Sequence, residues 1–548
     1  MINQKKNFKK CFQSLIGDKM EKIKNKNLWI VILINLFVFV IVNVLFDIKY
    51  EQVDDFIIYH LYSSLDGTYN IHGVYIHPLL CFLISLFFRI LPMINWHSIF
   101  LLSVQFICFT IIGNILLKKH QNGIAIVLYT IWVAIFYTVF LLLIQYTSVA
   151  ALLILTSLVM MIDKLEKKEK TKIKTVIPSF ILFTLGIMLR MQSLFIIVPF
   201  FALYFVIVLL DNKLEKTVKK DKIIKILQYD LIYLIITIIV YVSNSMMYQS
   251  DVYKKYTQYN STRTTLHDAI YVDYEENKET FDQIGWSSND HYLFYTFNFG
   301  DENIFSEENL QKILDDKIQK DGPNYLNMDI KQIEESFSSE ITGSIVYLFL
   351  FFLILFVICL FQKDKTMVSI LIFITTIAIH VLFIMMGRSM LRVVIPEYVI
   401  GTVLLIYFMN FKETEEIKDD IRNSVILCFI IGMICIFVGN SYDYGYQLEG
   451  YQNYRDLISE TNAHKENVYL YTVPSLQDRY LAYSVYQMPP KGAFSNLRVL
   501  GRMGYVYAKL RRFQKEISAR WEFLRFVKRK CISNRWRCLL VWKKISKL

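Results

Sequence analysis

The 548-residue sequence has little charge and no informative cysteine pattern. Only 20% of its residues are Asp, Glu, Lys or Arg, whereas 54% are hydrophobic and gather in long blocks. This composition excludes a soluble globular enzyme, a disordered chain and a coiled coil. The eight cysteines lie in the termini or in apolar runs and never at metal-ligand spacing. Neither a zinc site nor a disulfide framework is therefore indicated.

Several nucleotide-binding and transport signatures are also missing from the sequence. It contains no P-loop, no Gly-rich dinucleotide motif and no internal repeat, which disfavours an ATP-driven transporter. It also lacks paired half-helices broken by Gly or Pro at matching positions of two halves, and this weakens the interpretation as a secondary transporter.

What the sequence does contain is a series of apolar segments from end to end. Most are long enough to cross a hydrocarbon layer of roughly 30 Å as a helix, so the sequence predicts an all-α polytopic membrane protein. The first segment follows a basic N-terminus and lacks a small-residue cleavage signature, so we expect a retained span. The twelve segments are 28–46, 74–94, 99–117, 123–144, 147–162, 176–189, 194–210, 229–247, 341–361, 367–386, 393–410 and 423–439.

The loops between these segments predict the topology. Connections rich in Lys and Arg should be cytoplasmic, and all of them can be so only if one of the twelve segments does not cross. We expect that segment to be the one interrupted by Pro78, Arg89 and Pro92, lying in the interface or re-entering. Eleven crossings place the N-terminus in the cytoplasm and the C-terminus outside. The basic connections are 1–27, 118–119, 163–175, 211–225, 363–365 and, more weakly, 412–422.

This topology divides the chain into eight parts. Any chemistry is expected on the outer face, because the cytoplasmic face has only short basic connectors. The parts are a basic N-terminus (1–27), a first transmembrane helix (28–46), a first outer loop (47–77), a transmembrane bundle (78–247), a large outer loop (248–340), a second bundle (341–439), a small C-terminal αβ outer segment (440–501) and a basic tail (502–548).

The tail differs in composition from the rest of the chain. Residues 502–548 contain eight Arg, seven Lys and two Glu, which gives them a net charge of +13. The whole chain has a net charge of +12. The body therefore carries −1, which gives no argument for a nucleic-acid partner. The abrupt change suggests a frameshift, and a real basic surface tail is the alternative. We place no function on these residues.

The first outer loop carries an acidic pair, Asp54 and Asp55. A carboxylate held at the membrane boundary faces a low dielectric, which raises its pKa and suits a general base acting on an acceptor hydroxyl. Adjacent helical residues diverge by about 100°, so we expect only one of the pair to point into a site. A solvated juxtamembrane pair is the alternative. His60, His72 and His77 could add donors or metal ligands, although polar interface residues are the simpler interpretation.

Three arginines are predicted at the outer ends of spans. Arg190 interrupts the apolar stretch 176–210, where a charge is costly enough to imply a partner. Arg388 and Arg392 are four residues apart and would share one helical face. The guanidinium fork matches phosphate oxygens, so the three predict a clamp for a lipid phosphate or diphosphate. Snorkelling to the headgroups is the alternative for each, and Glu397 could pair with Arg388 or Arg392.

The large outer loop combines aromatic residues with Asn, Asp and Arg. A sugar site needs stacking faces for the ring and directional hydrogen bonds for the hydroxyls, but an ordinary extracellular subdomain has the same mixture. Beyond residue 439, the helix-like ISETNA and strand-like VYLYTV stretches predict the αβ segment. The candidate acceptor- or sugar-binding residues are Arg263, Asp268, Asn289, Asp290 and Tyr292.

A basic N-terminus, one span, an outer loop with the acidic pair, the sequence His77-Pro78-Leu79-Leu80 and many further spans occur in that order. This arrangement resembles the GT-C class of membrane glycosyltransferases, which includes protein O-mannosyltransferases and the aminoarabinose transferases of lipid A. The resemblance implies that a first-loop acidic residue acts on the acceptor, that outward basic residues bind a polyprenyl-phosphate donor, and that the product forms with inversion. Only Asp54 or Asp55 matches a family motif position. The second acidic residue is often Glu, and the usual Pro-Pro is here His-Pro.

The sequence therefore predicts a glycosyltransferase that moves a sugar from a polyprenyl-phosphate donor to a cell-envelope glycan or lipid acceptor. Asp54 or Asp55 would be the base, and the three arginines the donor clamp. The expected partners are membrane lipids, the polyprenyl-phosphate sugar and the glycan or lipid acceptor; no cofactor is assigned beyond the lipid-linked donor, and a divalent metal is left open. A polysaccharide polymerase and a lipid or polysaccharide exporter are the alternatives. The composition resembles that of AT-rich bacteria, so we expect a bacterial cell membrane.

Overall fold

The computed structural model describes most of the membrane-embedded chain. It covers residues 26–51, 53–65, 69–167, 175–296, 301, 303–321, 330–343, 345–362 and 364–410, with 458–465, 467–471, 484–489, 492–493, 495–499 and 540–543. The basic N-terminus up to residue 25, the apolar segment 423–439 and nearly all of the tail 502–548 lie outside the described residues.

The described chain contains eight helices that are long and apolar enough to cross a membrane. The protein is therefore a mostly helical, multi-pass membrane protein, as predicted, whereas the count of eleven crossings stays a prediction. The eight are α2 (Lys26–Leu45), α5 (Trp96–Lys119), α6 (Gly123–Leu142), α7 (Tyr146–Glu166), α9 (Leu194–Leu210, preceded by the 3-10 turn η2, Met191–Ser193), α10 (Lys216–Met247), α17 (Thr366–Met385) and α18 (Leu391–Phe408).

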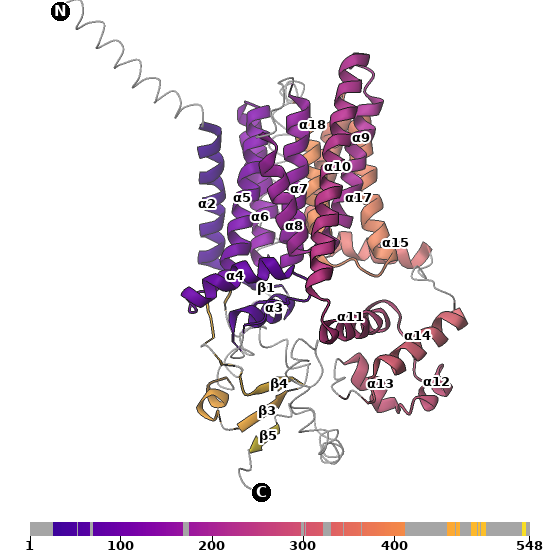
Figure 1. Ribbon diagram of the computed structural model, residues 1–548. Helices are drawn as coiled ribbons and strands as arrows, with labels where there is room; N and C mark the ends of the chain where they lie inside the picture. The colour runs from indigo at the N-terminus through magenta and orange to yellow at the C-terminus, as the bar shows by residue number, and fades with distance from the viewer. Residues whose placement is uncertain are drawn as a thin grey trace, which may run out of the picture.

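Four further apolar or amphipathic helices occur in the described part of the membrane region. Two apolar helices, α4 (Pro78–Ile90) and α8 (Ile177–Leu189), have 13 residues each, which is short for a span. α15 (Ile330–Thr342) meets α16 (Val346–Leu360) at an angle of 91°, and the pair would be a ninth span if it is one broken helix. α8 runs alongside the long helices, whereas α4 lies across one end of the bundle (Figure 1).

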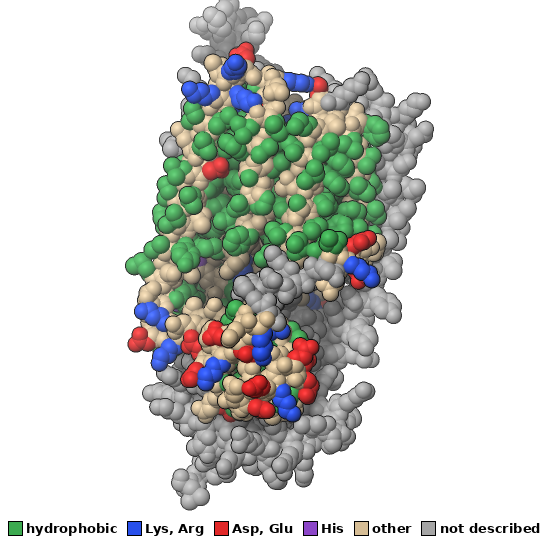
Figure 2. All heavy atoms as spheres, turned by 90° about the vertical axis from the view of Figure 1, so that its right-hand side faces the viewer, with side chains coloured by type: hydrophobic (Ala, Val, Ile, Leu, Met, Phe, Trp, Pro, Cys, Tyr) green, Lys and Arg blue, Asp and Glu red, His purple; other side chains and the backbone are tan. Residues whose placement is uncertain are grey.

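α7 is the central helix of the bundle. In its most apolar 18-residue window 89% of the residues are buried, compared with 22% for α2 and 17% for α10. α7 packs against α5, α8, α9 and α18, while α2 lies at the edge of the bundle (Figure 1). Figure 2 shows a broad hydrophobic band across one face of the bundle, with most of the charged side chains above and below it. Polar groups at the ends of α7 are therefore enclosed by protein on most sides.

The first loop is attached to the start of α7 by a short parallel strand pair. β1 (Lys49–Tyr50) pairs with β2 (Leu143–Ile144), which directly precedes α7. The Glu51 N–H continues the ladder by donating to the Ile144 carbonyl at 2.9 Å. α3 (Val53–Ser63) follows and lies at the same end of the bundle as α4 (Figure 1). Two residues of strand thus position the acidic pair beside the N-terminus of α7.

Residues 251–321 form a small helical subdomain at that same end of the molecule (Figure 1). Its own core combines aliphatic side chains with the aromatic residues Phe281, Trp286, Phe294 and Phe305. We call it the 251–321 subdomain. Its elements are α11 (Asp251–Thr264), the π-helix η3 (Thr265–Ala269), α12 (Lys278–Gln283), α13 (Ser288–Tyr295) and α14 (Glu307–Asp321).

Three short strands are described in the C-terminal part. They are β3 (Asn467–Tyr471), β4 (Leu497–Val499) and β5 (Leu540–Lys543), in the order β4-β3-β5. β3 pairs in parallel with β4 and antiparallel with β5. β3 overlaps the predicted VYLYTV strand at residues 468–471, but much of 440–501 lies outside the described residues, so the αβ segment stays a prediction.

Candidate functional site

Asp55 is the buried member of the acidic pair. Its Oδ1 lies 3.0 Å from His97 Nε2 and accepts a hydrogen bond from the Tyr146 backbone N–H at 3.1 Å. Burial raises the pKa of Asp55 well above its usual range; the nearby Asp54 adds to the rise, and the Tyr146 hydrogen bond opposes it. The carboxyl is therefore fixed against the first turn of α7.

The partners of Asp55 belong to a larger buried network. His97 Nδ1 contacts the Tyr62 hydroxyl, so the imidazole bridges α3 at two points. Next to it, the Tyr50 hydroxyl lies 2.5 Å from Ser98 Oγ and accepts from the Asn95 amide at 3.0 Å. His97 could not be predicted from the sequence, because nothing local marks a histidine at the start of α5 as a partner of the first loop.

Asp54 takes the other direction, as the 100° rule predicts. It is half-buried, whereas Asp55 is fully buried. It lies close enough to act electrostatically on Glu51 and on the Tyr146 hydroxyl. Of the two carboxylates, Asp54 is thus the one that a bound molecule can reach.

Arg190 lies directly after α8 and points toward the start of α7. Its Nη1 donates to the Tyr146 hydroxyl at 3.1 Å, and its guanidinium carbon lies 4.1 Å from the centre of the Tyr75 ring. The buried Nε–H has no hydrogen-bond partner among the described residues. A charge-assisted donor in an enclosed position is therefore still unused.

Arg392, in the first turn of α18, also lies beside the start of α7. Its Nη1 lies 3.8 Å from Glu51 Oε2, and both atoms are buried without a hydrogen bond to any part of the chain that the structure describes. Burial raises the pKa of Glu51 to about 7, and the charge of Arg392 opposes part of this rise. The Arg392 carbonyl accepts from Ser148 Oγ of α7 at 3.0 Å, which fixes the backbone here.

A third unused donor lies at the N-cap of α7. Gln145 Oε1 accepts from the Thr147 and Ser148 backbone N–H groups, which caps the helix. The Gln145 Nε2 amide is buried and has no hydrogen-bond partner in the described ranges. We call the group Glu51, Asp54, Gln145, Arg190 and Arg392, gathered around the start of α7, the α7 site.

Arg388 does not share a helical face with Arg392, so that part of the prediction is wrong. α17 ends at Met385, Gly387 adopts a φ of +62°, and the Arg388 N–H donates to the Phe383 carbonyl at 2.8 Å. α18 begins only at Leu391. Arg388 therefore belongs to the turn that closes α17.

Glu397 does not pair with an arginine in the described structure. It is fully buried, and neither carboxylate oxygen has a hydrogen-bond partner among the residues that the structure describes. Nearby, His380 lies 3.0 Å from Glu340 and 2.9 Å from the Tyr398 hydroxyl. This second polar cluster lies between α15, α17 and α18.

The predicted sugar-binding residues lie in three helices of the 251–321 subdomain, α11, η3 and α13. Arg263 is only 2% exposed and donates to Asn260 within its own helix at 2.9 Å. Asp290 accepts from Ser287 and completes the cap of α13. Asn289 is half-buried, Tyr292 is 64% exposed, and Asp268 lies in η3.

The first-loop histidines make structural contacts. His72 stacks on Tyr253 with ring centroids 4.0 Å apart, and His77 caps α4 and contacts Ser243 at 3.0 Å. Burial lowers the pKa of both imidazoles. Within the described ranges, no group of three or more His, Cys, Asp or Glu side chains could hold a metal ion.

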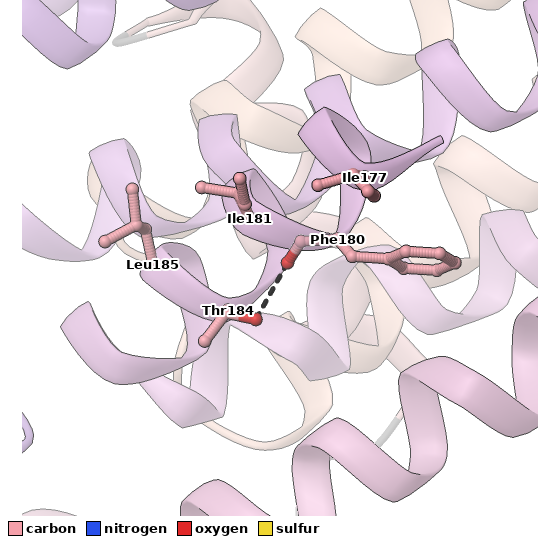
Figure 3. Close-up of a pocket in the computed structure, with 5 residues that line it drawn as sticks. All are labelled: Ile177, Phe180, Ile181, Thr184 and Leu185. Carbon is pink, nitrogen blue, oxygen red and sulfur yellow. Dashed lines mark hydrogen bonds between the residues drawn. The ribbon is translucent and has the colours of Figure 1, made fainter. Parts of the chain in front are cut away.

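An apolar cavity lies on the surface of α8, the helix that ends before Arg190. Its volume is about 270 Å³, and the one polar side chain that lines it, Thr184, donates its hydroxyl to the Phe180 carbonyl at 2.7 Å (Figure 3). The lining residues are Ile177, Phe180, Ile181, Thr184 and Leu185. The lining thus presents hydrocarbon to whatever occupies it.

Comparisons with family models, with curated proteins and with solved structures found no match to this chain. The GT-C resemblance therefore remains a prediction from the sequence.

Proposed function

We propose that the protein is an inverting membrane glycosyltransferase of the GT-C type. It would transfer a sugar from a polyprenyl-phosphate donor to a cell-envelope glycan or lipid acceptor. The observation that carries this proposal is the convergence of Arg190 and Arg392, each with an unused buried N–H, beside the first-loop carboxylates. Two cations with free donors suit a phosphate, and the neighbouring carboxylate suits a proton acceptor.

In this proposal the arginines bind the donor phosphate. The acceptor hydroxyl attacks the anomeric carbon, the bond from that carbon to the phosphate oxygen breaks, and its electron pair stays on the phosphate. Arg190 and Arg392 stabilise the charge that develops there, and the Gln145 amide can add a neutral donor. A single displacement gives inversion.

Asp54 is the better candidate for the base. The proton of the acceptor hydroxyl goes to its half-exposed carboxylate. Asp55 instead holds the first turn of α7 through Tyr146 and orients His97, so we assign it a positioning role.

The apolar cavity on α8 is evidence that the site binds the lipid part of the donor. Leu185 lines its end nearest Arg190, five residues before the arginine, which is about 7.5 Å along a helix. A prenyl chain lying against α8 would therefore lead to a phosphate at Arg190. Arg388, in the turn before α18, is a further cation at the same end of the bundle.

The proposed topology keeps eleven crossings. They are α2, α5 to α10, α16 to α18 and the segment 423–439, with α4 in the interface. The N-terminus would be cytoplasmic, the C-terminus outside, and the membrane that of a bacterial cell. The α7 site and the 251–321 subdomain would then share the outer face, because both lie at the same end of the bundle (Figure 1).

The decisive experiment compares the envelope glycans of a deletion strain complemented with wild type, Asp54→Asn or Asp282→Asn. Asp282 is exposed in α12, so its variant controls for loss of a carboxylate. We expect one missing substituent in the deletion and in Asp54→Asn, restored by wild type and by Asp282→Asn. Full transfer by Asp54→Asn at normal expression would remove Asp54 as the base. Shortened chains with intact repeat units would replace the transferase with the polymerase.

One observation favours the exporter as a second candidate. Glu397, His380 and Glu340 form a polar cluster among α15, α17 and α18, and such groups often mark ion or substrate pathways. The exporter predicts that Glu397→Gln abolishes appearance of the glycan outside the cell while its lipid-linked precursor accumulates inside. The transferase predicts the full precursor outside with the sugar missing.

A further inference from the structure

Glu51 and Arg392 form an ion pair that is incomplete. Charge-assisted hydrogen bonds between guanidinium and carboxylate are about 2.7–2.9 Å long, whereas Glu51 Oε2 and Arg392 Nη1 are 3.8 Å apart. The two side chains are only 11% and 17% exposed, so water does not fully replace the missing bond. The backbone on each side is held, by the Glu51 N–H on Ile144 and by Ser148 on Arg392.

The charged neighbours of Glu51 leave it in a predominantly negative environment. Arg392 of α18 is the cation that faces it, while Asp54 and Asp55 of α3 repel its negative charge. On its own strand, Lys49 is engaged with Asp47 at 3.0 Å. A phosphate that approached Arg392 would add another negative charge next to a carboxylate that already has two carboxyl neighbours.

We propose that a phosphodiester binding at Arg392 takes the place of the Glu51 carboxylate, and that Glu51 takes up one proton from solvent in the same event. Binding of the lipid-linked donor is then coupled to proton uptake. This inference rests on the proposed function, because it assumes that the α7 site receives a phosphate. It assigns Glu51 a task separate from that of Asp54, which accepts the acceptor proton.

The direction of the pH dependence follows from linkage. In the free protein the carboxyl has a pKa of about 7, and a bound anion raises it further. The bound state therefore holds more protons than the free state, so affinity falls as pH rises through 7. If Glu51 is fully protonated when the diester is bound, affinity is about tenfold weaker at pH 8 than at pH 6.

The test uses the full-length protein in detergent and farnesyl methyl phosphodiester, whose single charge is constant between pH 6 and pH 8. Calorimetric titrations at both pH values give the affinity of wild type, Glu51→Gln and the control Glu335→Gln, which alters an exposed residue of α15. We expect the tenfold fall in wild type and in the control. Glu51→Gln should bind equally at both pH values and about tenfold more tightly than wild type at pH 8.

A second measurement needs only the wild-type protein. Titrations at pH 7 in two buffers of different ionisation enthalpy give the number of protons taken up, and we expect about half a proton per diester. No uptake in wild type, or an unchanged pH dependence in Glu51→Gln, would overturn the inference and leave the proposed function standing.

Different results would contradict the proposed function and the proton uptake by Glu51. If folded wild type does not bind the prenyl diester at either pH, the proposed function fails and the inference fails with it. If dimethyl phosphate binds as tightly as the prenyl diester and with the same proton uptake, the site takes free phosphate esters. The inference on Glu51 is then upheld, and the lipid-linked donor is overturned.

Discussion

In the 251–321 subdomain two charged residues singled out by the sequence are held by hydrogen bonds within their own segment, whereas at the α7 site three buried N–H donors have no partner among the described residues. Arg263 is bonded to Asn260 and Asp290 to Ser287. Arg190, Arg392 and Gln145 each keep a buried donor without a partner in the described chain. The same residue types thus serve structure in one region and remain available in the other.

The difference has an energetic meaning. A buried polar group without a hydrogen bond costs about 1–3 kcal/mol, and more if it is charged. Three such donors around one helix start are a substantial cost to a fold of ordinary stability. We infer that the α7 site is built for a ligand that supplies the missing acceptors, and that the 251–321 subdomain owes its polar pattern to folding.

The largest expected effect separates the two regions by stability. Trp286 packs against Phe281 and Phe305 and donates from Nε1 to the Ile304 carbonyl at 2.7 Å. Trp286→Ala should lower the free energy of unfolding of the subdomain by about 3–5 kcal/mol. Hydrogen exchange of residues 251–321 measures this, while affinity for the prenyl diester should stay within about twofold of wild type. An equal loss of affinity would show that the two regions are not independent.

Substitution of the arginines should have a smaller effect, which changes sugar transfer and not stability. Arg190→Gln and Arg392→Gln should each lower kcat/KM for sugar transfer by about 10²–10³-fold, because each removes a preorganised donor to the leaving phosphate. The melting temperature should change little, because each substitution removes a single weak contact, the Arg190–Tyr146 hydrogen bond or the incomplete Arg392–Glu51 pair, together with an unused buried donor. Arg89→Gln, an exposed arginine of α4 next to Tyr69, is the matched control. A large fall in melting temperature with normal transfer by the folded fraction would assign the arginines to structure.

The smallest effect refines the position of Arg190. Tyr146→Phe removes its hydrogen-bond acceptor but leaves the ring contacts, so we expect a loss of about 0.5–1.5 kcal/mol, which is at most about tenfold in kcat/KM. The comparison variant is Tyr241→Phe, on the exposed side of α10. An effect as large as that of Arg190→Gln would mean that Tyr146 itself contacts the substrate.

Many helices of the bundle could be predicted because a membrane span requires a continuous apolar run of sufficient length. An apolar run long enough to cross the membrane is visible in the sequence whatever it packs against. The different burial of Asp54 and Asp55 follows from helical geometry in the same local way, because adjacent residues of a helix diverge by about 100°. The placement of Arg190 in an otherwise apolar stretch was likewise readable, because charge at that depth implies a partner.

The contact partners of the site residues could not be predicted from the sequence, because they depend on pairing between distant segments. Glu51 meets Arg392 only through the β1–β2 pair and the packing of α18 on α7. His97 meets Asp55 in the same way. The error on Arg388 had a local signal: a Gly with positive φ directly after an apolar helix is a common helix end, and Gly387 provides it.

The contact between Glu51 and Arg392 also bears on how the protein is made. The ribosome produces the first loop early and α18 late, so the two halves of the α7 site are inserted into the membrane at different times. Until α18 is inserted, Glu51 and the neighbouring Asp54 and Asp55 lack the Arg392 cation. A chain arrested after α10 would therefore bear a half-formed binding centre, and its acidic loop would be exposed to membrane quality control.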